Sequence, residues 1–133
     1  MTLLDAGAVR GAIISNIESN ATILALLIDA DEVREFNWKG QEFTYPNIRV
    51  RINSITPFHD CYQRLDASIM FFSETASSEE CETAIGVIAN EYHEESFTQN
   101  GIRFSEIGVD PIPAISENVR TWRGEVQLNC LIN

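Results

Sequence analysis

The sequence predicts an α+β domain in which helices pack on one face of an antiparallel sheet. Two segments repeat apolar residues at helical spacing, and four segments alternate apolar with polar residues as half-buried strands do. These segments follow one another in the order helix, strand, strand, helix, strand, strand. We therefore expect a sheet of four strands, or slightly more, whose second face is polar. The whole chain, residues 1–133, has an ordinary length for one domain.

The first expected helix covers about residues 3–18, where apolar side chains recur every three or four positions. Thr2 followed by Asp5 is the expected cap of this helix. Ser19 and Asn20 then offer a new cap, and the stretch ATILALLI after them is expected to form one or two buried helical turns.

Residues 29–45 have no sustained helical period and are rich in aromatic residues. Phe36 and Trp38 precede a turn at Lys39-Gly40, and Phe43 and Tyr45 follow it. We expect an aromatic arm or loose hairpin here. Because interface cores are enriched in aromatic residues, this arm is a candidate contact surface. The alternative is that it folds over the core of its own chain.

The clearest strand is expected at residues 47–55, because IRVRINSI alternates strictly and Pro46 is tolerated at a strand start. Residues 56–60, with Pro57, supply a turn. Residues 65–71 alternate in the same way and form the antiparallel partner.

The main helix is expected at about residues 78–94. Ser77 and Glu80 are spaced as a capping box, and an apolar stripe follows at helical spacing. Asn100-Gly101 is then a strong turn signal before the strand IRFSEIGV, which Asp110 to Pro113 should end. The last expected strand, about residues 122–132, has sharply divided faces.

The charge balance argues against general attraction to nucleic acid or anionic membranes. The chain has 9 Lys and Arg against 20 Asp and Glu, a formal net charge of −11. Its three cysteines are widely spaced and form neither a disulfide framework nor a zinc motif, which indicates a reducing, intracellular place of folding. We expect no signal peptide and no membrane segment, since the longest apolar stretch, ILALLI, is far too short to span a bilayer.

Acidic and basic residues are distributed unequally between the expected helices and strands. Seven glutamates and no Lys or Arg lie between Glu74 and Glu95, and anions are disfavoured at a helix C-terminus, where Glu91, Glu94 and Glu95 are expected. Six of the eight arginines lie in or beside expected strands. This predicts an acidic helical side and a more basic sheet face.

The acidic helical side of one copy can bind the more basic sheet face of the next copy. A front-to-back contact of that kind closes into a ring when its rotation divides a full turn. The candidate subunit-contact residues are Arg49, Arg51, Arg64, Arg123, Phe36, Trp38, Phe43, Tyr45, Glu91, Glu94 and Glu95. The alternative is that Arg51 and Arg64 pair across strands with Asp66 or Glu125 of their own chain.

If the strand arginines contact a neighbouring copy, replacing Arg49 and Arg51 by Glu should abolish assembly. The monomer should stay folded, because exposed strand positions usually tolerate substitution within about 0.5 kcal/mol.

We recognise no catalytic, cofactor-binding or metal-binding motif in the sequence. His59, Asp60 and Cys61 adjoin in the expected turn and could be imagined as a thiol and imidazole pair, but sequence neighbours on a turn seldom converge. The glycines are scattered and form no phosphate-binding loop. Glu79, Glu80 and Glu82 lack the spacing of a calcium loop. We expect a protein that is not an enzyme.

The layout resembles the phage tail-completion and tail-terminator proteins, which complete a tail or join it to the head. The resemblance covers nearly the whole chain, except the arm at residues 29–45. It depends on the N-terminal helix followed by ATILALLI, on FTYPNIRVRI, on LDASIMFFSETASSEECETAIGVIANEY and on VRTWRGEVQLNCLI.

This resemblance implies a virion component without enzymatic activity, a ring expected to be a hexamer, located in the neck at the top of the tail and assembled in the host cytoplasm. Its implied partners are further copies of itself, the tail tube protein and a head-completion or connector protein. DNA would only pass through the channel, and no membrane is involved.

Two other functions stay open at this stage. One is a small-ligand-binding or regulatory module, which would need a concave apolar pocket. The other is a thiol enzyme that uses Cys61 and His59.

Overall fold

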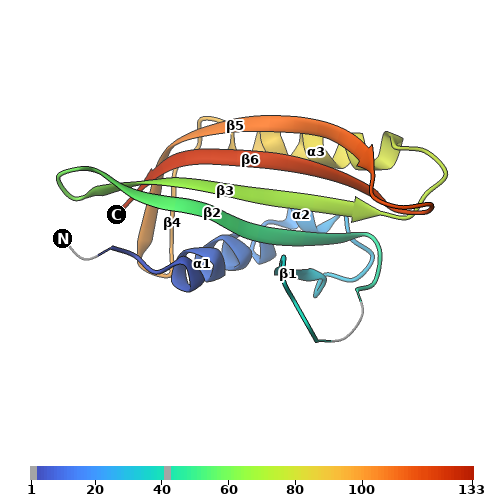
Figure 1. Ribbon diagram of the computed structural model, residues 1–133, viewed down its shortest axis with the longest axis horizontal. Coiled ribbons are helices and arrows are strands. Elements are labelled where there is room, and N and C mark those ends of the chain that lie inside the picture. Colours follow the sequence, from blue (N-terminus) through green and yellow to red (C-terminus); the bar gives the residue numbers. More distant parts are fainter. Residues whose placement is uncertain (1–2, 41–42) are drawn as a thin grey trace.

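The computed structural model describes residues 3–40 and 43–133. Its helices are α1 (Ala6–Glu18), α2 (Ala21–Leu24) and α3 (Glu79–Tyr92). Its strands are β1 (Val33–Glu35), β2 (Asn47–His59), β3 (Tyr62–Ser73), β4 (Phe97–Gln99), β5 (Ile102–Ser116) and β6 (Trp122–Ile132). The strands form one sheet in the order β1-β2-β3-β6-β5-β4 (Figure 1).

The α+β class is confirmed, and the expected antiparallel sheet of four strands, or slightly more, is confirmed in part. The described residues form a six-stranded mixed sheet, because β1 pairs in parallel with β2 while the other pairs are antiparallel. The additional strands β1 and β4 have 3 residues each, too few for an alternation to be legible. Residues 33–35 form a strand that pairs with β2, whereas a loose hairpin was expected there. Residues 41–42 of the expected arm lie outside the described residues.

The proline-containing segments do not end their strands as expected. β2 continues through Pro57 to His59, and β5 continues through Pro111 and Pro113 to Ser116. The reason is that β1 pairs only with Ile48–Val50 and β4 only with Ile102–Phe104. Beyond these short partners β2 and β5 are edge strands, and an edge strand needs no donor on its outer side.

The helix caps agree with the sequence only in part. The Asp5 carboxylate accepts from the backbone N–H groups of Gly7 and Ala8, at 2.8 and 3.2 Å, so α1 starts after Asp5. Thr2, the expected cap, lies outside the described residues. Asn20 caps α2 as expected.

The expected capping box of Ser77 and Glu80 is wrong. α3 begins after Ser78, whose side chain makes no capping hydrogen bond and instead donates to Glu82 at 2.6 Å. The helix also ends at Tyr92, two residues earlier than expected.

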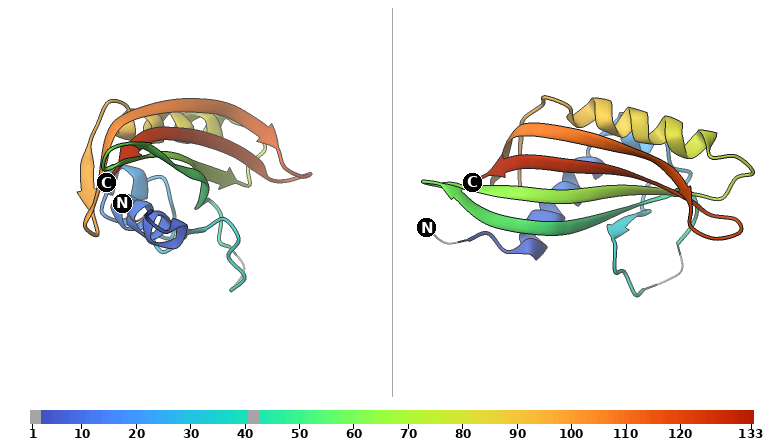
Figure 2. Two further views of the ribbon diagram at one scale, coloured as in Figure 1. Left: turned by 60° about the vertical axis from the view of Figure 1, so that its left-hand side comes forward. Right: turned by 45° about the horizontal axis from the view of Figure 1, so that its top comes forward.

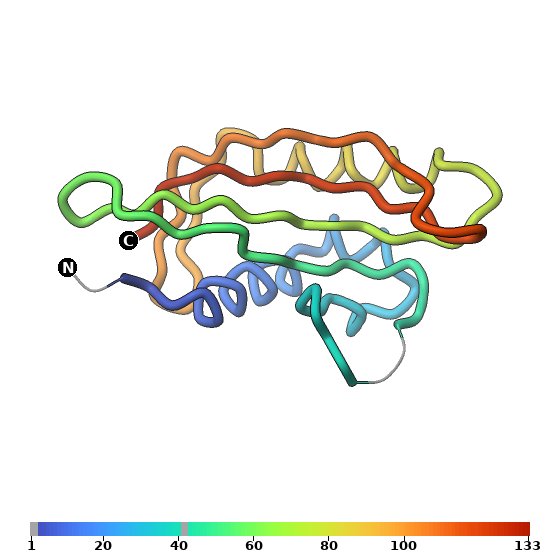
Figure 3. The backbone as a smooth tube through the Cα atoms, in the orientation of Figure 1, coloured from blue at the N-terminus to red at the C-terminus, as the bar shows by residue number. Residues whose placement is uncertain are grey.

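The sheet curls around the helices, as Figures 2 and 3 show, so that α1 and α3 both cover its inner face. α1 contacts β1, β2 and β4, while α3 contacts β3, β5 and β6. One cluster of buried side chains fills the space between the layers, with Phe71, Ile88 and Tyr92 among its largest members. The outer face of the sheet, which we call the open face, carries no helix among the described residues.

Candidate assembly surfaces

Arg49, Arg51, Arg64 and Arg123 lie on the open face, as the alternation predicted. Their strand neighbours Ile48, Val50 and Leu65 are fully buried in the core cluster on the inner face. The strand register places Arg49 beside Met70 and Arg51 beside Ser68, and it places Arg123 beside Phe72. The four guanidinium groups nevertheless have different surroundings.

The Arg49 guanidinium lies between two aromatic rings of its own chain. Its central carbon is 3.8 Å from the ring centroid of Phe43 and 4.0 Å from that of Phe72. Its Nε donates to Asn47 Oδ1 at 3.1 Å. Burial lowers the pKa of Arg49, and Tyr45 opposes this shift. Arg49 thus holds the aromatic arm against the open face.

The rest of the arm packs in a similar way. Arg51 lies 5.2 Å from the ring of Phe36, and Arg34 lies 4.7 Å from the ring of Trp38. The arm therefore folds onto its own chain, the second of its two predicted roles. Val33 joins the helix-side core, while Phe43 lies on Arg49 of the open face. The arm's predicted role as a contact surface stays a prediction. Trp38 stays 39% exposed.

The predicted cross-strand ion pairs of Arg51 and Arg64 with Asp66 or Glu125 are wrong. Arg51 Nε donates to Asn53 Oδ1 at 2.8 Å, and Asn53 Nδ2 donates onward to Ser68 at 2.9 Å and to Asp66 at 3.3 Å. Ser68 Oγ donates to Glu125 at 2.8 Å. These carboxylates are therefore bonded to amide and hydroxyl groups, and they form no ion pair with either arginine.

Arg123 does have a carboxylate partner in its own chain. Its Nε lies 3.4 Å from Glu117 Oε2, in the loop between β5 and β6. Within the described residues, Arg49, Arg51 and Arg64 form no ion pair. Of these three, only Arg64 is exposed. Among the four arginines proposed as subunit contacts, Arg64 is consequently the one best placed to meet another molecule.

The helical side is acidic, as the charge distribution predicted. Glu79, Glu80 and Glu82 lie in the first turn of α3, and its last turn has no basic residue. Within the described residues, none of the α3 glutamates pairs with Lys or Arg.

The predicted contact residues at the end of α3 have separate surroundings. Glu91 is half-buried within α3, whereas Glu94 and Glu95 are exposed beyond its end. Glu94 adopts a φ of 59° and its backbone N–H donates to the Ile107 carbonyl at 3.1 Å. His93 Nε2 lies 3.6 Å from Glu94 Oε1.

An apolar pocket of about 540 Å³ lies where α3 begins. We call it the helix-end pocket. Leu26, Phe71 and Ala84 contribute its apolar wall, and Glu79, Glu80 and Thr83 are also among its lining residues. Sequence reasoning missed this pocket, because its residues come from three separate segments and no local pattern connects them.

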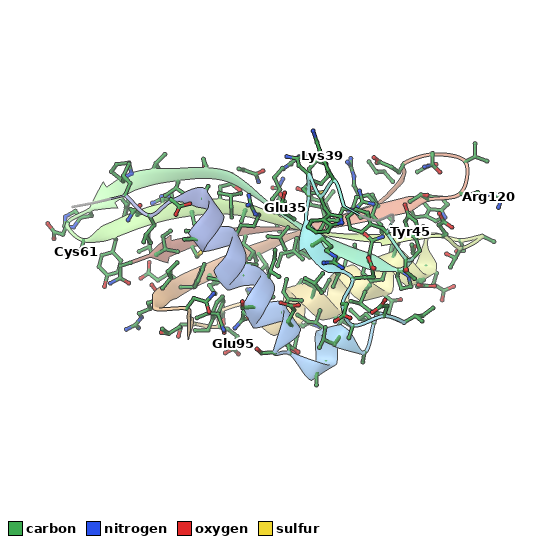
Figure 4. The ribbon with its side chains drawn as sticks, turned by 90° about the horizontal axis from the view of Figure 1, so that it is seen from below. Glu35, Lys39, Tyr45, Cys61, Glu95 and Arg120 are labelled. Carbon is green, nitrogen blue, oxygen red and sulfur yellow. The ribbon has the colours of Figure 1, made fainter. Side chains whose placement is uncertain are left out.

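A second exposed apolar feature lies at the tip of the β2–β3 hairpin. Phe58 is 51% exposed and Tyr62 is 38% exposed, and Arg64 lies 4.5 Å from the ring of Phe58. We call these three residues the hairpin knob. The turn occupies Asp60 and Cys61, later than expected, because β2 pairs with β3 as far as His59 and Tyr62. Figure 4 shows Cys61 at one end of the elongated molecule and Arg120 at the other.

The thiol–imidazole pair of Cys61 and His59 that the sequence suggested does not form in the described residues. His59 Nδ1 lies 3.1 Å from Asp60 Oδ2, and no hydrogen bond joins His59 to the exposed Cys61 thiol. Cys81 and Cys130 are buried, and burial raises the pKa of their thiols to about 11 and about 12. Over residues 3–40 and 43–133, no three His, Cys, Asp or Glu side chains are grouped to hold a metal ion. None of the described helices combines the length and apolarity needed to cross a bilayer.

Sequence comparison finds no matching protein family and no matching curated protein. Comparison of the fold with solved structures does find matches. The chain superimposes on a chain of the virion of a native gene transfer agent (GTA) particle with a TM-score of 0.69 and 13% sequence identity, over 96% of each chain. A second solved structure, of a protein whose name states no function, matches with a TM-score of 0.62 and 11% identity, over 97% of this chain and 94% of the other. The chain therefore shares its fold with a component of a virion particle.

Proposed function

We propose that this protein is a structural component of a phage-like virion, which forms a hexameric ring that completes the tail and joins it to the head. The observation that carries the proposal is the fold shared with a chain of a GTA virion particle, over 96% of both chains. The similarity covers nearly all of both chains. The resemblance of the sequence to tail-completion proteins points in the same direction.

The distribution of charge supports assembly from copies of one chain. The α3 glutamates have no Lys or Arg partner among the described residues, and Arg64 on the opposite face is exposed without a carboxylate partner there. Unpaired charges of opposite sign on two faces favour a front-to-back contact, and such a heterologous contact closes into a ring when its rotation divides a full turn.

The proposed partners follow from the proposed place in the particle. One side of the ring would meet the tail tube protein, and the other would meet a head-completion or connector protein. DNA would pass through the channel without being held, because a chain with a net charge of −11 offers little counterion release to a duplex. In this function the chain carries out no chemistry.

The direct test is native mass spectrometry with negative-stain imaging of the purified protein at moderate salt. The proposal expects a six-fold annulus and a mass of six chains. A monomer or a two-fold dimer at every concentration that the protein tolerates would contradict it.

The helix-end pocket favours one second candidate, a small-ligand-binding module. Its volume of about 540 Å³ lies within the range of roughly 300–1,000 Å³ that is usual for ligand pockets. Thermal melting in the presence of a library of small apolar carboxylates and amines tests this function. A ligand that raises Tm for the wild type, but not for Ala84→Trp, would support it, and the absence of any shift would remove it.

A further inference from the structure

We propose that the hairpin knob of one copy inserts into the helix-end pocket of the next copy, and that this contact joins the ring. The inference depends on the proposed ring function and names the two surfaces that meet. The chosen occupant of the pocket is therefore a second copy of this chain.

The knob has the composition of an interface anchor. Phe58 and Tyr62 are exposed at the end of a long hairpin, and exposed aromatic side chains of this kind are typical interface anchors. Tyr62 and Arg64 are two positions apart on β3, so their side chains share one face of the strand. The Arg64 guanidinium lies on the Phe58 ring, and the knob thus combines aromatic surface with a cation that has no ion pair in the described residues.

The helix-end pocket has complementary properties. Leu26, Phe71 and Ala84 offer an apolar wall that an aromatic ring can contact, and Glu79 and Glu80 supply two carboxylates without an Arg or Lys partner among the described residues. An aromatic ring that enters this pocket would bring Arg64 with it. The two surfaces are therefore complementary in charge, and both also offer apolar area for contact.

The positions of the two surfaces fit a front-to-back contact. The knob lies at the free end of the β2–β3 hairpin, while α3 starts at the opposite end of the sheet, as Figures 1 and 2 show. The knob belongs to the open face, and the pocket lies on the helix side, where Phe71 joins the core. One copy can then use its knob toward one neighbour and its pocket toward the other, as a closed ring requires.

The exposed Cys61, at the hairpin tip, makes this contact measurable. The structure describes all three cysteines, and the other two are buried. In a Thr83→Cys variant, the exposed position 83 of the pocket lining would carry a second reactive thiol. A Thr98→Cys variant, exposed on β4 and away from the pocket, is the matched control.

The experiment treats wild type, Thr83→Cys and Thr98→Cys with a short bismaleimide and counts covalently joined chains on a denaturing gel, with native mass spectrometry of the same samples. We expect dimers and longer ladders for Thr83→Cys alone, and we expect their yield to fall to the control level when Phe58→Asp or Cys61→Ser is added. Rings in which Thr83→Cys cross-links no better than Thr98→Cys would overturn this inference and leave the proposed function standing. Monomers without cross-links in every sample would overturn both.

Discussion

At the scale of single residues, the arginines that the sequence grouped together turn out to have different roles. The alternation of residues 48–53 places Arg49 and Arg51 on the face away from the core. The alternation does not show that Phe43 and Phe72 enclose Arg49, because one ring comes from the arm and the other from the neighbouring strand. The expectation that Arg49 tolerates reversal to Glu is accordingly revised. Removing this guanidinium would also destabilise the monomer, and Arg64 is the better position for an assembly test.

Replacing Arg49 by Ala is expected to lower the free energy of unfolding by about 1–2 kcal/mol, since two rings lose a stacked cation and its aliphatic stem. Arg49→Lys should recover only part of this, because an ammonium group cannot lie flat between two rings. Urea unfolding measures both. Arg103→Ala, at an exposed position, is the control and should change stability by less than about 0.5 kcal/mol. An Arg49→Ala variant as stable as this control would show that the stack contributes nothing.

The buried thiols predict a loss of stability at alkaline pH. The pKa of Cys130 is about 12 in the folded protein against an ordinary 9.0, so the unfolded chain loses this proton first as pH rises. The contribution is complete below about pH 9 and is lost as pH rises toward the folded value. The urea midpoint of the wild type should therefore fall as pH rises above about 9, and that of Cys130→Ala should fall less steeply. Cys61→Ala, which removes an exposed thiol, should leave the slope unchanged. Equal slopes for Cys130→Ala and wild type would refute this prediction.

At the scale of elements, strong local patterns in the sequence predicted helices and turns. They did not predict how all the strands pair. Helical spacing predicts α1 and α3, and the Asn100-Gly101 turn is found between β4 and β5 with φ values of 53° and 79°. The strands β1 and β4 could not be predicted, since they depend on the backbone of β2 and β5 to pair with and not on their own composition. Their shortness also explains why prolines are allowed further along β2 and β5. Whether a strand lies at the edge of a sheet is decided only when the sheet assembles, and the strand's own sequence does not show it.

The contact between α3 and β6 gives a prediction at this scale. A Cβ atom at Gly124 would lie 2.3 Å from Ile85 Cγ1 and 3.0 Å from Cys81 Sγ. Gly124→Ala should therefore destabilise the protein by about 1–3 kcal/mol through overpacking. Adding Ile85→Ala should give a double variant less destabilised than the sum of the two single changes.

The control for this contact is Gly86→Ala, on α3 itself. A Cβ there meets nothing within 4 Å, so the change should be neutral or stabilising by about 0.5–1 kcal/mol. Chemical denaturation of the four variants checks both expectations. Strict additivity of the Gly124 and Ile85 changes would show that the two residues do not press on each other.

At the scale of the whole molecule, the sequence predicted an acidic helical side and a more basic sheet face. It did not predict the two surfaces that we propose to meet. The acidic character of α3 and the outward arginines follow from composition and strand alternation. Neither the helix-end pocket nor the hairpin knob could be found without the fold. The pocket gathers residues from the segment after α2, from β3 and the loop after it, and from α3, and the knob depends on where the hairpin turns. We propose that these oppositely charged surfaces meet between copies of the chain.

A charge exchange between two variants tests that claim most directly. Arg64→Glu gives a chain whose knob and pocket are both acidic, and Glu79→Lys with Glu80→Lys gives a chain in which both are basic. By native mass spectrometry, each variant alone should stay unassembled at moderate salt, and an equal mixture should form rings in which the two chains alternate. Assembly of Arg64→Glu alone to the same extent as wild type, or a mixture that stays apart while the wild type forms rings, would contradict the account.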